Sequence, residues 1–150
     1  IRRQRQMCIR DSPLSAFIEE TAKEDPDAEW ITVDTVSQMA NFVMANGGRV
    51  LNGTNFLPDF DKWEILDPDG TYEEVWNRYL NQTVTLTDDQ TSIEKVATDA
   101  ALWHLNPEDM VRLGVKYVLS TTDITEFTDA YDLNVSAVFE EDGYTVYMIE

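Results

Sequence analysis

The hydrophobic positions alternate between helical and extended spacing along the chain, which is typical of layered α/β folds. After Pro13, apolar or small residues recur three and four positions apart and predict a first helix: Leu14, Phe17, Ile18, Thr21 and Ala22. Asp25-Pro26-Asp27 ends this helix, and Trp30-Ile31-Thr32-Val33 follows as a short buried strand. The chain thus opens with a helix and a strand.

A strand–helix–strand unit is predicted next. Thr35 and Gln38 have the spacing of a capping box, and the helical face that follows is Val36, Met39, Ala40, Val43 and Met44. Gly47-Gly48 ends this helix, and Arg49-Val50-Leu51-Asn52 is a second short strand. Because the crossover is short and helical, the two strands are expected to be parallel.

The middle of the chain is less regular. Gly53 to Gly70 is rich in turn formers and aromatic residues without a sustained period, so we expect a packed loop. Thr71 and Glu74 form a second capping-box pattern ahead of a helical face made of Tyr72, Val75, Trp76 and Tyr79. Gln82 to Thr87 alternates as a strand does, whereas Ile93 to Leu105 fits either a helix or two paired strands.

The last third is clearer. Asn106-Pro107 begins a helix that Gly114 ends, with Met110 and Leu113 facing inward, and Val115 to Leu119 is a core strand. Asp123 with Glu126 is expected to cap a short helix. Glu141-Asp142-Gly143 predicts the turn of a hairpin between Ala137–Glu140 and Tyr144–Ile149. The predicted fold class is α/β, a mixed and largely parallel sheet with flanking helices and a C-terminal β-hairpin.

The first eleven residues differ sharply from the rest. They are basic and resemble the translated read-through of a sequencing adaptor, so we treat residues 1–11 as a non-native or disordered leader and residues 12–150 as a single α/β domain. A native basic segment beside a membrane is the alternative. The leader holds four of the eleven basic residues and one of the twenty-nine acidic ones, which leaves 7 bases and 28 acids, a net charge of −21, on residues 12–150.

That charge excludes one class of partner, and the composition excludes the sites that need cysteine. An acidic surface repels nucleic acid and anionic lipid, because phosphate binding depends on Lys and Arg. The single cysteine, Cys8, lies in the leader, so the domain proper has no disulfide, thiolate zinc site or cysteine nucleophile. No run approaches the roughly 20 apolar residues that cross a bilayer. If the parent is a membrane protein, its spans lie outside this sequence.

No motif in the sequence defines a catalytic or metal site. His104, the only histidine, is expected to be a partly buried structural residue between Trp103 and Leu105. Asp67-Pro68-Asp69-Gly70 has part of a calcium-loop pattern, but a turn leading into the next helix fits it better. The many carboxylates guarantee acidic pairs without pointing to any one of them. We therefore expect no catalytic residue, no metal and no cofactor.

A ligand site is the more interesting possibility. Amides, an arginine and aromatic rings suited to a sugar or a carboxylate gather near a predicted strand end and a predicted helix end. The candidate ligand-binding residues are Asn52, Asn55, Trp63, Asn77, Arg78 and Tyr79. The structural alternative, which we favour, is that Asn52 and Asn55 satisfy turn backbone and that Arg78 pairs with one of the many acids.

A series of landmarks runs through nearly the whole chain after Ser12. They are Asp25-Pro-Asp-Ala-Glu-Trp30, Leu51-Asn-Gly-Thr-Asn-Phe56 with Pro58, Trp63 to Pro68, Trp76-Asn-Arg-Tyr79, and Leu113-Gly-Val-Lys-Tyr-Val-Leu119 with the hairpin ending in Val146-Tyr147. In this order they resemble the C-terminal extracytoplasmic region of YfhO-like proteins, within the GT-C-type class of polytopic bacterial membrane glycosyltransferases that use lipid-linked sugar donors. The landmarks are structural, so no catalytic residue carries over.

The resemblance implies a location and a context. We expect a domain at the extracytoplasmic face of the bacterial cell membrane that is not itself catalytic, with the transmembrane portion of the same polypeptide and a glycan acceptor as partners. The parent would modify cell-envelope polymers or lipids. Two alternatives stay open: a free-standing ligand-binding or interaction module, and a small acidic hydrolase, which needs two converging carboxylates with raised pKa values.

Overall fold

The computed structural model describes residues 12–54, 59–77 and 80–150, whose strands form one eight-stranded sheet. The strands are β1 (Glu29–Val33), β2 (Arg49–Val50), β3 (Asn81–Leu86), β4 (Ser92–Ala97), β5 (Ala100–Leu105), β6 (Val115–Ser120), β7 (Val135–Glu141) and β8 (Tyr144–Ile149). The helices are α2 (Pro13–Glu24), α3 (Ser37–Ala45), α4 (Phe60–Leu66), α5 (Glu73–Trp76), α6 (Pro107–Arg112) and α7 (Thr125–Ala130).

The sheet has a parallel centre and antiparallel edges. Its order is β4-β5-β3-β1-β6-β8-β7, with β2 paired to β1 beside this path. The β1–β2, β1–β3, β1–β6 and β3–β5 ladders are parallel, whereas β4–β5, β6–β8 and β7–β8 are antiparallel. This confirms the predicted mixed, largely parallel α/β sheet, its C-terminal hairpin and the parallel pairing of the first two strands.

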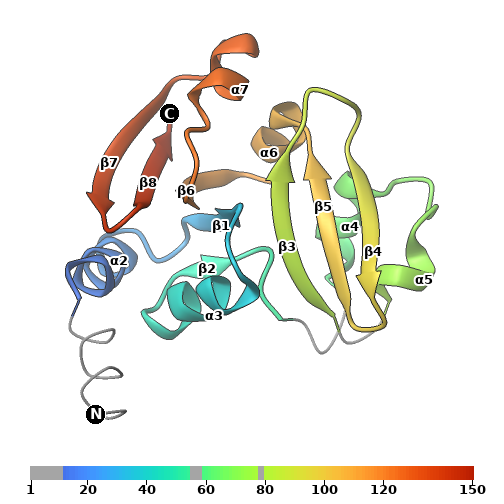
Figure 1. Cartoon of the computed structure of the whole chain (residues 1–150), viewed down its shortest axis with the longest axis horizontal. Coiled ribbons are helices and arrows are strands. Elements are labelled where there is room, and N and C mark those ends of the chain that lie inside the picture. Colours follow the sequence, from blue (N-terminus) through green and yellow to red (C-terminus); the bar gives the residue numbers. More distant parts are fainter. Residues whose placement is uncertain (1–11, 55–58, 78–79) are drawn as a thin grey trace.

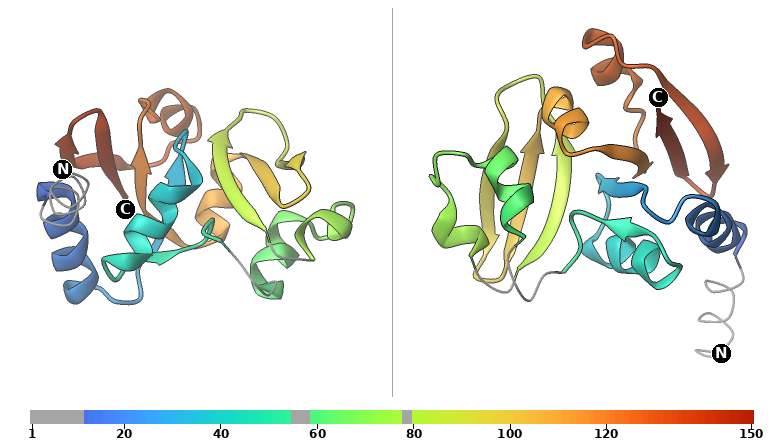
Figure 2. Two further views of the ribbon diagram at one scale, coloured as in Figure 1. Left: turned by 60° about the horizontal axis from the view of Figure 1, so that its bottom comes forward. Right: turned by 180° about the vertical axis from the view of Figure 1, so that it is seen from behind.

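Helices cover the two faces of the sheet at different places (Figures 1 and 2). Helices α2 and α3 pack with β1, β6, β7 and β8 on one face, around Trp30, Tyr117 and Leu119. On the opposite face α4, α5 and α6 lie over β3, β4 and β5, as the view from behind in Figure 2 shows. Trp63 and Trp103 belong to this second and larger core. The alternating burial of β3 and β5 follows, because one face of these strands is helix-covered and the other open.

Local sequence signals place several elements correctly. Ser12 caps α2, with Pro13 at its first position, and Asn106 caps α6, with Pro107 in the same role. In both helices the cap side chain accepts a backbone N–H that the helix itself leaves unpaired. The hairpin turn has Gly143 at φ 82°, as predicted, together with Asp142 at φ 48°.

Two predictions in the first half are wrong, and a third is correct only in part. The second helix begins at Ser37 with Val36 as its unbonded N-cap, so Thr35 does not cap it. The expected loop from Gly53 to Gly70 contains α4, whose seven residues are too short for a sustained period. A helix does follow Thr71, as predicted, but it is the single turn of α5 and has no side-chain cap of its own.

The structure also decides two further expectations. Ile93 to Leu105, which fitted either type of element, lies in the antiparallel strands β4 and β5. The predicted cap Asp123 lies one residue before the N-cap of α7, and its Oδ1 accepts the Thr125 N–H at 2.9 Å. Within the described part of the chain, no helix has the length and apolar character that crossing a bilayer requires.

Candidate functional site

Asn52 closes a gap in the sheet where β2 ends. Strands β2 and β3 both pair with β1, β2 with its first two residues and β3 with its last. Thr32 lies between these two ladders, and its backbone N–H donates to Asn52 Oδ1 at 3.0 Å. Asn52 Nδ2 donates in return to Thr32 Oγ1 at 2.8 Å. The fully buried Asn52 amide thus does what a strand peptide would otherwise do.

A second buried amide, Gln82, fixes the segment that follows β2. Its Nε2 donates to the Gly53 carbonyl at 3.0 Å. Lys62 reaches the same segment from α4, since its Nζ donates to the Leu51 carbonyl at 2.9 Å and to Gln82 Oε1 at 3.4 Å. These bonds join α4, the end of β2 and the start of β3 into one buried polar cluster, which consists of Thr32, Asn52, Lys62 and Gln82.

Lys62 is the unusual member of this cluster because it is a cation with 4% of its surface exposed. None of the ion pairs found in the described residues includes it. Its Nζ lies 5.1 Å from the ring centroid of Trp63 and 5.2 Å from that of Trp103. Burial lowers the pKa of the Lys62 amine to about 8, and the charge of Asp59 opposes that shift.

A surface cavity of about 320 Å³ is lined by Lys62 together with charged and apolar neighbours. The other lining residues are Glu29, Met44, Gly48, Arg49, Val50, Leu51 and Asp59. Arg49 Nη2 lies 3.2 Å from Glu29 Oε1. Burial raises the pKa of the Glu29 carboxyl, and the Arg49 guanidinium opposes the rise. The cavity therefore brings a buried amine, a partly buried carboxyl and a guanidinium to one place.

Only part of the predicted ligand site can be traced. Asn55, Arg78 and Tyr79 lie outside the described residues. The Asn52 amide is hydrogen-bonded to Thr32, so the backbone that it satisfies belongs to a strand and not, as the structural alternative predicts, to a turn. Asn77 is exposed at the end of α5, and no hydrogen bond in the described part of the chain joins it to Asn52 or Trp63.

Trp63 is a core residue. It is 2% exposed, stacks on Trp76 at a centroid distance of 5.3 Å and meets Trp103 edge to face at 5.6 Å. The indole N–H groups of Trp63 and Trp103 are the buried side-chain polar atoms for which the described residues supply no acceptor. Trp63 thus contributes packing and the ring face next to Lys62, rather than an exposed surface for a sugar.

The sequence reasoning missed Lys62 and Gln82. The burial of Lys62 has no local signal as long as residues 53–70 are read as a loop. Once α4 is recognised as a helix, Lys62 and Trp63 both lie on the side of Leu66, because residues three and four positions apart are neighbours on a helix. Gln82 had a signal that was not used: it alternates with Val84 and Leu86 on the buried side of β3.

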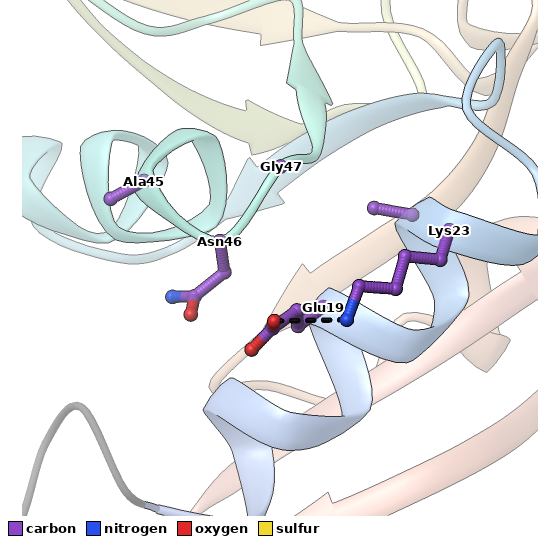
Figure 3. Close-up of a pocket in the computed structure, with 6 residues that line it drawn as sticks. Glu19, Lys23, Ala45, Asn46 and Gly47 are labelled. Atoms are coloured by element: carbon purple, nitrogen blue, oxygen red, sulfur yellow. Dashed lines mark hydrogen bonds and ion pairs between the residues drawn. The ribbon is translucent and has the colours of Figure 1, made fainter.

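A second hollow lies between α2 and the end of α3 (Figure 3). It measures about 400 Å³, and in Figure 3 the side chains of Glu19 and Lys23 form an ion pair along its edge, with an N···O distance of 3.1 Å. The Asn46 amide that faces it already accepts from Ser15 Oγ at 2.6 Å and donates to the Phe42 carbonyl at 2.9 Å. Its polar groups are satisfied locally, so it is a weaker candidate than the cavity at Lys62.

The remaining sequence motifs have structural roles. Both oxygens of Asp67 are used, Oδ1 by the Thr71 N–H at 3.0 Å and Oδ2 by the Tyr72 N–H at 2.8 Å and Trp76 Nε1 at 2.9 Å. The Asp67 motif is therefore the predicted turn, and no acidic, histidine or cysteine cluster in the described residues has metal-binding geometry. His104 is half-buried and lies 2.9 Å from Glu94 Oε2.

The fold and the cluster together define a mixed α/β domain with a buried polar centre. The chain belongs to the family described as Domain of unknown function (DUF7654), whose model matches residues 8–150. The match starts four residues before Ser12, and the assignment of residues 1–11 to a leader stays a prediction. No curated protein and no solved structure matches the chain.

Proposed function

We propose that the chain is an extracytoplasmic accessory domain of a YfhO-like, multi-spanning membrane glycosyltransferase-like protein. In this proposal the transmembrane portion of the same polypeptide is its partner, and the domain helps to hold a glycan acceptor while the chemistry takes place elsewhere in the protein. The substrate context is the glycosylation of cell-envelope polymers or lipids.

The burial of the landmark residues carries this proposal. Trp30, Asn52, Trp63 and Trp76, one from each of the first four landmarks, are 1%, 0%, 2% and 7% exposed. They form the two cores and the polar cluster that hold the sheet to its helices. These landmark residues are part of the packed interior of the fold. The series therefore supports a resemblance over the whole domain rather than in one short motif. The family match covers residues 8–150, a range that includes all of these landmarks.

The acidic surface supports a neutral glycan as the acceptor. With a net charge of −21 on residues 12–150, the surface is repelled by anionic lipid and by phosphate-rich polymers. A neutral glycan carries no such penalty, and it can bind through hydrogen bonds and ring contacts. The charge also favours a domain that stands clear of anionic headgroups.

Two experiments test the proposal. Residues 12–150 contain no cysteine, so Asp69→Cys in the full-length protein supplies a single exposed thiol in the domain. A membrane-impermeant maleimide should label it in intact cells, and labelling only after lysis would contradict the proposed location. The purified chain should also not turn over a lipid-linked sugar donor, and turnover above the buffer rate would contradict the accessory role.

A free-standing ligand-binding module is the second candidate, and the cavity at Lys62 favours it. A surface cavity that is lined in part by Lys62 can bind a small molecule without a membrane partner. Gene context separates the two candidates. A coding frame that continues upstream into hydrophobic spans favours the accessory domain, and a start codon with a ribosome-binding site near residue 12 favours the free module.

A further inference from the structure

The partners of the Lys62 amine match the neutral form of that group. A neutral amine has two N–H bonds and one lone pair, whereas an ammonium has three N–H bonds. The described residues give Lys62 Nζ two oxygen acceptors, the Leu51 carbonyl and Gln82 Oε1, and both are uncharged. The faces of Trp63 and Trp103 favour the cation, but burial outweighs them and lowers the pKa of the amine to about 8.

The cavity provides what a nucleophilic amine needs. At pH 7.5 an amine with a pKa near 8 is neutral in about a quarter of the molecules, against about one in a thousand for an exposed lysine. Glu29 lines the same cavity and holds its proton to higher pH than a surface glutamate does, because burial raises its pKa. The cavity volume of about 320 Å³ admits a molecule of a few heavy atoms.

We propose that this cavity is a reversible covalent binding site at which Lys62 Nζ condenses with a small aldehyde. The lone pair of the amine attacks the carbonyl carbon to form a C–N bond, and the proton that nitrogen gives up is transferred to the former carbonyl oxygen. Glu29 protonates the resulting hydroxyl, which leaves as water while the C=N bond forms. Glu29 recovers a proton when the iminium nitrogen loses one, so no oxidant or reductant is consumed.

Reductive trapping tests the site residue by residue. The chain contains four lysines, Lys23, Lys62, Lys95 and Lys116, of which Lys95 is exposed. The folded chain is treated with glycolaldehyde and cyanoborohydride at pH 7.5, and the modification of each lysine is followed by peptide mass spectrometry. Lys62 should be modified at least about tenfold faster than Lys95, since far more of it is neutral. Modification of Lys62 at the rate of Lys95 or more slowly would overturn the proposal.

The fold and the role of Glu29 are tested separately. In denaturing urea the preference for Lys62 should disappear, because the preference depends on the folded cavity; a preference that persists in urea would contradict the cavity as its cause. Glu29→Gln should slow trapping at Lys62 several-fold while leaving its acetylation by an activated ester unchanged, since acylation needs no proton from Glu29. Glu19→Gln, at an exposed position of α2, is the matched control and should change neither rate. Equal trapping rates in Glu29→Gln and the unsubstituted chain would show that Glu29 does not donate the proton.

Discussion

Asn52 Oδ1 accepts the backbone N–H of Thr32 at 3.0 Å, and through this bond a side chain twenty residues further along completes the hydrogen bonding of the central strand β1. The pair lies where β1 passes from its ladder with β2 to its ladder with β3. At this point neither β2 nor β3 supplies an acceptor to the Thr32 N–H. The Asn52 landmark is therefore required by the way the sheet is assembled.

Asn52→Ala should destabilise the fold by about 2–3 kcal/mol, because the buried N–H and hydroxyl of Thr32 both lose their partner. Urea unfolding followed by tryptophan fluorescence measures this change. Asn77→Ala is the matched control, since Asn77 is exposed and the described residues form no hydrogen bond with its side chain. The control should change stability by less than about 0.5 kcal/mol. Equal effects at the two positions would contradict the role given to Asn52.

Lys62 should make the fold more stable as pH rises. Its pKa is about 8 in the folded chain, against 10.5 for an ordinary lysine side chain, so the unfolded chain binds more protons between these two pH values. Stability rises with pH wherever the unfolded state binds more protons. The contribution of Lys62 to the free energy of unfolding is therefore least favourable below pH 8, and it increases up to about pH 10.5. Between pH 7.5 and 10 this amounts to about 2 kcal/mol.

The measurement compares urea unfolding of the unsubstituted chain and Lys62→Met across this pH range. The difference between the two cancels the titration of other groups. The unsubstituted chain should gain stability relative to Lys62→Met as pH rises. A difference that stays constant from pH 7.5 to 10 would show that the amine titrates normally in the folded chain.

Asp67→Ala should destabilise the fold by about 3 kcal/mol, because the Thr71 and Tyr72 N–H groups and the Trp76 indole lose one acceptor residue. Asp69→Ala, at an exposed position in the same turn, should cost less than about 0.5 kcal/mol. Calcium should leave the melting temperature of the unsubstituted chain unchanged, because both oxygens of Asp67 are already used. A melting temperature that rises with calcium and falls with chelator would restore the calcium-loop interpretation.

The sequence predicts most elements whose signals are local. Caps such as Ser12 and Asn106 act within three residues, and the Asp142-Gly143 turn needs only its own backbone preference. The errors occur where tertiary contacts override local signals. Thr35 carries a cap pattern, yet the helix begins at Ser37, and α4 is stabilised by its core face at Trp63 rather than by any cap.

The candidate site was predictable only in part. Asn52 and Trp63 were identified from their residue types, but their partners Thr32, Gln82 and Lys62 come from three other segments. The spacing of residues along one segment does not reveal which amide replaces a peptide between two strands. The depressed pKa of Lys62 likewise results from the burial of α4 against β3 and β5, which is a tertiary property.

The most direct test of the proposed function is to sequence the source DNA upstream of residue 12 and recover the full coding frame. An accessory extracytoplasmic domain predicts that the frame continues upstream into a series of hydrophobic segments, each of roughly 20 residues. A native start codon with a ribosome-binding site near Ser12, and no such segments in frame, would contradict it and leave the ligand-binding module as the better account.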